Sequence, residues 1–288
     1  MRKSLLAMIA ATAIAATPAL AASTDRITVT ERGSNGPDVI LIPGLVSSSA
    51  VWDGIAAHLE KDHRLHIVQV DGFAGAPPNG NKDGAVIAPA MEAVHDYVVA
   101  HHLKAPAVIG HSMGGLMGMM LARRHPEDVG RLMIVDSLPF FSVLMGAQDV
   151  ASAEPMAAKM RDGLLSASTD GFAQRQEATI DRLVKSPDGR KLALAWSLAS
   201  DRSVAARAAY DAMTTDMRTE LPKIAQPVTV LYPWDASSPF PQAATDGLYQ
   251  SNYAALPHKT MQRIDGSYHF IMLDQPAAFA AAVDTFLK

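Results

Sequence analysis

The sequence contains no cysteine in its 288 residues. The chain can therefore form neither a disulfide bond nor the lipid attachment of a lipoprotein, and its stability must come from an apolar core. Hydrophobic residues make up 49% of the chain and the mean hydropathy is +0.08, which together indicate a globular protein with a sizeable core.

The sequence also lacks any concentration of charge of one sign. Lysine and arginine total 25, aspartate and glutamate total 29, and the formal net charge is −4. Because no basic run stands out, the composition argues against nucleic-acid binding. No internal repeat or low-complexity segment follows the N-terminal stretch. The length then suits one large α/β domain that carries an insertion.

The N-terminal stretch has the pattern of a secretory signal. Two positive charges are followed by a short apolar core over residues 5–16, and small residues stand at positions 19 and 21. We predict a signal peptide over residues 1–21, cleaved after Ala21 or, as the second choice, after Ala22. The apolar core is too short to span a membrane comfortably, so no stable membrane anchor is expected. The mature protein would be exported, to the periplasm or the medium if the host is a bacterium.

The chain that follows alternates short apolar runs with segments of helical pattern. This alternation predicts an α/β fold with a mostly parallel, doubly wound sheet, since parallel strands need crossover helices between them. An alternating run at 26–31 is expected to be an edge strand. The other expected strands are 39–42, 65–70, 107–109, 131–136, 228–232 and 260–264. The expected helices of the core are about 49–61, 86–102, 241–254 and 276–287.

The alternation stops between residues 139 and 224. This segment has no clear strand, and helical stretches are expected around 150–165, 170–185, 189–199 and 203–218. We therefore divide the mature chain into a core of residues 22–138 and 225–288 and a helical cap insertion of residues 139–224. The insertion joins two strands that end near the expected site, so its helices should cover that site.

Residues 110–115, Gly-His-Ser-Met-Gly-Gly, connect the apolar run 107–109 to a helical stretch that ends near Arg124. Strand, G-x-S-x-G, helix is the setting of a nucleophile elbow. The sharp turn exposes the serine hydroxyl, leaves no room for side chains at Gly110 and Gly114, and directs the helix N-terminus at the site. Ser112 is therefore the candidate nucleophile.

A serine hydroxyl needs a base, and the base needs an orienting group. His269 follows the last expected strand and is the candidate base. Asp235 follows the strand 228–232 and is the preferred acid. Asp136 also follows a strand and is the alternative acid. All three lie at carboxyl ends of expected parallel strands, where sites of open α/β sheets assemble.

With these residues in place, the chain resembles the α/β-hydrolase superfamily, in the branch of single-chain esterases with a helical cap. The matching stretches are residues 42–45, 70–75 and 110–115, Asp235 with Pro239, and residues 266–276. The resemblance implies that Ser112 is the nucleophile, His269 the general base and then acid, and Asp235 the orienting carboxylate.

The resemblance also implies an oxyanion hole, which binds the negative oxygen that forms during acyl transfer. The amide of Met113 would be one donor. The second is usually the amide after the glycine of a His-Gly pair. Here Pro43-Gly44 replaces that pair, so the donor would be the amide of Leu45.

The leading interpretation is a secreted serine hydrolase that cleaves a small-molecule ester, or a related acyl substrate, through an acyl-enzyme. Amide or N-terminal peptide cleavage, lactone hydrolysis and carbon–carbon cleavage are alternatives, since one fold hosts many reactions. A ligand-binding or sensor protein that retains the pocket is the non-enzymatic alternative. No cofactor is expected, and no metal, because no spacing of histidine and acidic residues has the character of a metal site. No motif in the insertion identifies the physiological substrate, and the oligomeric state is left open.

Overall fold

The computed structural model describes residues 21–288, so the predicted signal peptide lies outside the described residues except for Ala21. Its centre is a sheet of eight strands in the order β1-β2-β4-β3-β5-β6-β7-β8. The strands β3 to β8 are parallel to one another, whereas β2 is antiparallel to both of its neighbours, β1 and β4. The bounds are β1 Ala21–Ser23, β2 Ile27–Arg32, β3 Asp38–Ile42, β4 Arg64–Val70, β5 Ala107–His111, β6 Arg131–Val135, β7 Val228–Trp234 and β8 Lys259–Asp265. The mostly parallel sheet predicted from the sequence is confirmed.

The burial of the strands follows the residue patterns. Strand β2 alternates, with Ile27 and Val29 fully buried and the threonines between and after them partly exposed. Residues 39–42 of β3 are all fully buried, as expected of a strand covered on both faces.

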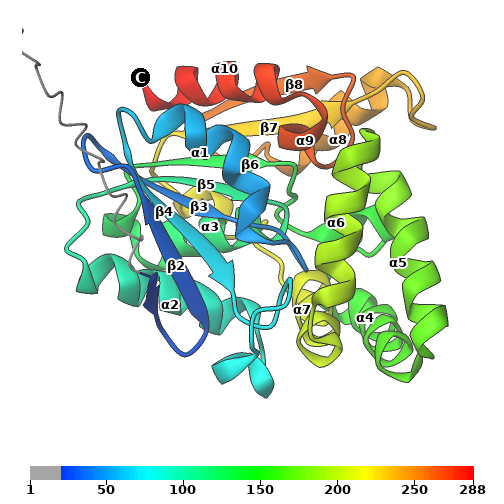
Figure 1. Cartoon of the computed structure of the whole chain (residues 1–288). Coiled ribbons are helices and arrows are strands. Elements are labelled where there is room, and N and C mark those ends of the chain that lie inside the picture. The colour runs from blue at the N-terminus through cyan, green and yellow to red at the C-terminus, as the bar shows by residue number, and fades with distance from the viewer. Residues whose placement is uncertain (1–20) are drawn as a thin grey trace, which may run out of the picture.

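Two helical layers cover the sheet, one on each face (Figure 1). The first layer contains α1 Asp53–Leu59, α9 Ile271–Asp274 and α10 Pro276–Leu287. The second contains α2 Ile87–Ala100, α3 Met113–Arg124 and α8 Gln242–Asn252. Short 3₁₀ helices complete the connections at η1 Ser49–Trp52, η2 Asn79–Lys82, η3 Pro126–Asp128, η4 Phe141–Met145 and η5 Leu221–Lys223.

Four helices lie between β6 and β7, in the stretch where the sequence pattern predicted helices. They are α4 Val150–Ser166, α5 Thr169–Leu183, α6 Pro187–Ala199 and α7 Arg202–Thr214. They gather beyond one end of the sheet in Figure 1. Hydrogen bonds from Asp201 N to Gly72 O (2.7 Å) and from Phe270 N to Leu183 O (3.2 Å) connect them to loops that follow β4 and β8. The helices therefore lie at the end of the sheet where the parallel strands terminate.

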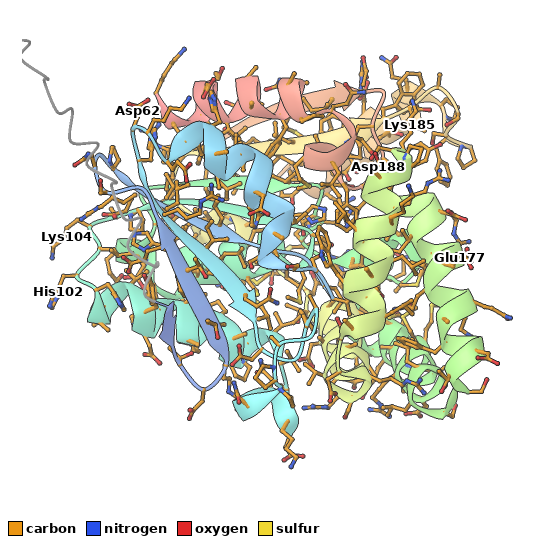
Figure 2. The ribbon with its side chains drawn as sticks, in the orientation of Figure 1. Asp62, His102, Lys104, Glu177, Lys185 and Asp188 are labelled. Atoms are coloured by element: carbon orange, nitrogen blue, oxygen red, sulfur yellow. The ribbon has the colours of Figure 1, made fainter. Side chains whose placement is uncertain are left out.

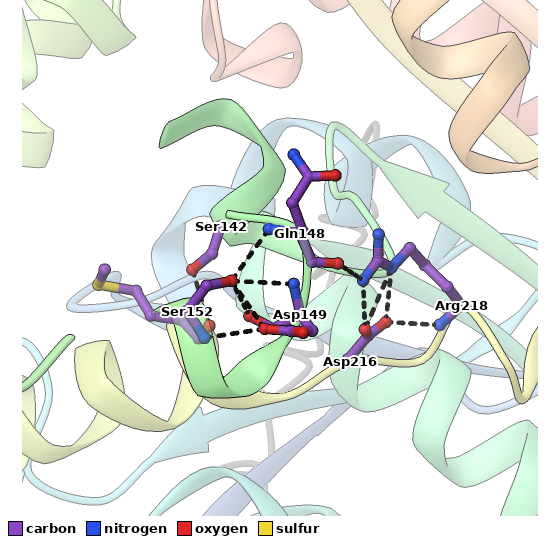
Figure 3. Close-up of polar contacts among 7 residues, drawn as sticks. Ser142, Gln148, Asp149, Ser152, Asp216 and Arg218 are labelled. Atoms are coloured by element: carbon purple, nitrogen blue, oxygen red, sulfur yellow. Dashed lines mark hydrogen bonds and ion pairs between the residues drawn. The ribbon is translucent and has the colours of Figure 1, made fainter. Parts of the chain in front are cut away.

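The chain enters and leaves this helical group at one place. Figure 3 shows Arg218, after α7, donating to Gln148 O (2.7 Å) before α4 and to the carboxylate of Asp216 (2.6 Å). Asp149 and Ser152 form a capping box that begins α4. These contacts hold the segment before α4 against the segment after α7, and the capping box fixes where α4 begins. Within residues 21–288, no helix is both long and apolar enough to cross a membrane.

Candidate active site

Ser112 occupies the turn between β5 and α3 in a strained backbone conformation. Its φ is 53° and its ψ is −119°, a region that residues other than glycine rarely adopt. Ser112 N donates to Val135 O (2.9 Å) and Gly115 N donates to Ser112 O (2.9 Å), so the neighbouring strand and the new helix hold the turn. The side chain remains partly exposed. This is the geometry of a nucleophile elbow.

The two glycines of the motif are required by close backbone contacts. A Cβ atom at Gly110 would lie 2.2 Å from Gly114 O, and one at Gly114 would lie 2.2 Å from Ile42 O. Both distances are far inside van der Waals contact, as the sequence pattern predicted. Gly114 therefore allows the loop after β3, which carries Gly44 and Leu45, to lie against the start of α3.

The imidazole of His269 is hydrogen-bonded to Asp136, with Nδ1 2.6 Å from Oδ2. The carboxylate accepts, so Nδ1 carries the proton and Nε2 is the nitrogen left as a base. The side chains are 21% and 11% exposed, so the pair is mostly shielded from solvent. The preferred prediction, that Asp235 contacts His269, is corrected: the alternative, Asp136, holds that position.

Asp136 directly follows β6, which is the neighbour of the strand that carries Ser112. Its backbone has a φ of 45°, and the Tyr249 hydroxyl from α8 donates to its Oδ1. Burial and then the charge of Asp136 raise the pKa of Tyr249 well above its usual range, so the phenol remains a donor. Each oxygen of the Asp136 carboxylate thus has a partner: Oδ1 accepts from Tyr249 and Oδ2 from His269.

Asp235 is bound by other groups. Its Oδ2 accepts from Lys185 Nζ (2.5 Å), and its Oδ1 accepts from Ser237 N (2.9 Å) and Ser237 Oγ (2.5 Å). The hydrogen bond from Lys185, followed by those from Ser237, lowers the pKa of Asp235 to about 2. Figure 2 shows Lys185 near the ends of α5 and α6, beside the loop after β7. Asp235 therefore joins the cap helices to the core.

The segment between α5 and α6, which contains Lys185, also contacts the loop that carries His269. The carboxylate of Asp274 accepts from Lys185 N (3.0 Å), Ser186 N (2.9 Å) and Tyr268 N (2.9 Å). Gln275, and not Asp274, is at the N-cap position of the last helix, so the Asp274 carboxylate is used for these three amides. The Asp274 carboxylate thus holds both Tyr268, which precedes His269, and the start of α6.

His111, the residue before Ser112, packs against the loop that carries His269 from inside the core. It is fully buried, its ring centroid lies 4.5 Å from that of His269, and its Nε2 donates to His269 O (3.1 Å). Burial, followed by the charge of His269, lowers the pKa of His111 well below its usual range. A neutral His111 connects the elbow to the backbone of His269.

The predicted oxyanion donors lie on the two segments that meet at Gly114. Met113 is the first residue of α3, and the first amides of a helix have no partner inside it. Leu45 follows Gly44, where an added Cβ would lie 3.1 Å from the Ser112 Cβ. Both amides thus belong to segments adjacent to the serine.

Tyr249, from α8, and Lys185, from the cap, have no sequence pattern that points to the site. The sequence spacing indicates no metal site either, yet His95, His125 and Asp128 lie together near the C-terminal end of α3, each offering one ligand atom within 4.8 Å of the others. These residues come together only in the folded chain, so short-range sequence patterns do not reveal them.

We predict that Tyr249→Phe lowers kcat by roughly 10-fold, because the Asp136 carboxylate loses a buried hydrogen-bond donor. A rise of about 1.4 kcal/mol in the activation free energy corresponds to this factor of ten. Tyr232→Phe is the matched control. Its ring stacks on Tyr249 at 4.4 Å, but its hydroxyl donates to Asp246 (3.0 Å). Steady-state kinetics of both variants check this. An equal loss of kcat in both would assign the effect to packing and not to Asp136.

The chain is similar to known hydrolases in sequence and in fold. The model of the Alpha/beta hydrolase family matches residues 39–282 of the chain. A pimeloyl-[acyl-carrier protein] methyl ester esterase of Aromatoleum aromaticum is 28% identical over 269 residues, which span 88% of this chain and 99% of the relative. The enzyme of the same name from Vibrio atlanticus is 26% identical over 271 residues, 88% of this chain and 95% of the relative.

Solved structures share the architecture at lower identity. A hydrolase from Pseudomonas aeruginosa superimposes with a TM-score of 0.75 at 19% identity, covering 95% of this chain and 99% of the other. The enol-lactonase from Burkholderia xenovorans superimposes with a TM-score of 0.71 at 20% identity, covering 91% and 96%. At these identities the likeness concerns the fold alone.

Proposed function

The protein is a serine-esterase-like hydrolase that belongs to the Alpha/beta hydrolase family, and we propose that Ser112, His269 and Asp136 form its catalytic triad. The observation that carries this assignment is the hydrogen bond from His269 Nδ1 to Asp136, next to the strained turn of Ser112. The order along the chain is serine, acid, histidine, as this fold requires.

In the proposed reaction, His269 Nε2 removes the proton of the Ser112 hydroxyl as its oxygen attacks the ester carbonyl. Asp136 holds the imidazole in the tautomer that leaves Nε2 unprotonated and stabilises the imidazolium that forms. The amides of Met113 and Leu45 stabilise the oxyanion. His269 then protonates the leaving alcohol, and water activated by the same nitrogen releases the acid from the acyl-enzyme.

For the substrate we infer a carboxylic ester of a small alcohol, with a methyl ester as the first candidate. Two relatives that align over at least 95% of their length are named as methyl ester esterases, and 99% of the first is covered by this chain. The acyl group of the substrate is proposed to face the cap helices. The segment between α5 and α6 is held beside His269 by contacts with Asp274 and Asp235.

The experiment that tests this proposal is a panel of substrates with one acyl group. Methyl esters of increasing acid length are compared with the matching amides and lactones by kcat/KM. We expect the methyl esters to be turned over and the amides to be poor substrates. Faster turnover of amides or lactones would move the activity to another acyl bond, and no turnover of any member would favour the ligand-binding alternative.

We also propose that the protein is exported after cleavage at Ala21 or Ala22. The support is the sequence pattern of residues 1–21. Intact-mass measurement of protein from the native host is expected to give a chain that begins at Ala22 or Ser23. A soluble cytoplasmic chain that retains Met1 would contradict export.

A further inference from the structure

A group of four ionisable side chains joins α2 to the end of α3, away from the catalytic residues. Glu92 and His95 lie one turn apart on α2, His125 ends α3, and Asp128 lies in η3. Helix α3 spans 12 residues from Met113, so about 18 Å separates this group from the elbow. The proposed reaction uses none of the four.

The contacts within the group pair each imidazole with a carboxylate. His95 Nδ1 lies 2.5 Å from Asp128 Oδ2, and His125 Nε2 lies 2.8 Å from Glu92 Oε2. The two rings stack with their centroids 3.6 Å apart. The Glu92 carboxylate on Nε2 of His125 leaves the other ring nitrogen for a metal ion and fixes the ring, as in the carboxylate–histidine–metal arrangement of known sites. Asp128 lies beside His95 and is itself a candidate ligand.

We propose that His95, His125 and Asp128 bind a divalent transition-metal ion, zinc as the first candidate, with Glu92 orienting His125. One ligand atom of each of the three residues lies within 4.8 Å of the others, whereas tetrahedral zinc ligands lie about 3.4 Å apart. To bring the ligand atoms closer, the two rings must leave their stacked arrangement, and their side chains, which are 24% and 21% exposed, border solvent. The open side leaves a position for water.

The charge of the group favours a cation. Glu92 and Asp128 contribute two negative charges, and Arg124, which binds Glu92 at 3.0 Å, contributes one positive charge. Asp128 is 5% exposed, so its charge is poorly solvated and depends on a partner such as His95 or a bound cation. Imidazole with a carboxylate is a donor set typical of zinc.

The test is zinc titration of the full chain, prepared without a histidine tag, against a chromogenic chelator. We expect one equivalent of zinc to bind, and His95→Gln and His125→Gln each to weaken it at least about 10-fold. His58→Gln is the matched control, since His58 is a partly exposed histidine paired with Asp284 at 2.8 Å and should leave binding unchanged.

A second readout separates a metal site from a structural role of the same residues. Zinc should raise the melting temperature of wild type and His58→Gln, but not that of the His95 and His125 variants, while ester turnover stays unchanged in all. Circular dichroism without metal confirms that each variant is folded. Equal zinc affinity in wild type and His95→Gln, or no bound equivalent in wild type, would overturn the proposal.

Discussion

Asp136→Asn is expected to lower kcat by about four orders of magnitude while the protein remains folded, as the corresponding change does in the best-studied serine protease. An asparagine at this position can present its amide nitrogen to His269 Nδ1. The imidazole then adopts the other tautomer, and Nε2 carries a proton when it should accept one. Tyr249 would still have an oxygen to bind, so the geometry around residue 136 should survive.

Asp235→Asn is the matched control, because it removes the charge of the other strand-end aspartate. Its partners are Lys185 and Ser237, so we expect a lower melting temperature and a change in kcat of less than about tenfold. Steady-state kinetics with a chromogenic ester and thermal melting of both variants check the ranking. If Asp235→Asn loses far more kcat than Asp136→Asn, the proposed triad is wrong about its acid.

Ser112→Ala is expected to have the largest effect of all, a loss on the order of 10⁶-fold in kcat, the size seen when a triad serine is removed. The variant has no nucleophilic oxygen, so no acyl-enzyme can form. The proposed oxyanion donors, the amides of Met113 and Leu45, remain, so substrate should still bind with a similar affinity.

Ser142→Ala serves as the control for loss of a buried serine hydroxyl. Ser142 Oγ donates to Met213 O (2.7 Å) at the base of the cap, and the change should cost stability with little loss of kcat. Kinetics and melting temperatures of the two variants are compared side by side. Substantial burst-phase or steady-state turnover by Ser112→Ala would mean that another group is the nucleophile.

Much of the fold could be predicted because its signals are local. Buried parallel strands such as 39–42 are continuous apolar runs, and the G-x-S-x-G turn has steric requirements that the sequence displays. The four cap helices were expected near their observed positions, since helical periodicity extends over many residues. These features depend on neighbours in sequence, and the structure confirms them.

The choice of acid depended on neighbours in space. Asp136 and Asp235 both follow parallel strands and both give the order serine, acid, histidine. What separates them is Lys185, which comes from the cap and binds Asp235, and Tyr249, which comes from α8 and binds Asp136. Neither partner has a sequence pattern that points to its aspartate.

The cluster of His95, His125 and Asp128 was missed for the same reason. His95 and His125 are 30 positions apart in sequence, and the packing of α2 beside the end of α3 brings their rings into contact. Spacing rules for metal sites detect ligands that share one helix or one loop, and this cluster draws on three separate elements.

The most direct test of the proposed chemistry is the site of covalent modification by a fluorophosphonate, which reacts with an activated serine hydroxyl. Wild-type protein is labelled, digested and mapped by mass spectrometry, with Asp136→Asn and Ser112→Ala treated in parallel. We expect one adduct on Ser112 in wild type, much slower labelling of Asp136→Asn and none of Ser112→Ala. A wild-type adduct on any other residue, or equal labelling of Ser112→Ala, would contradict the assignment of Ser112 as the nucleophile.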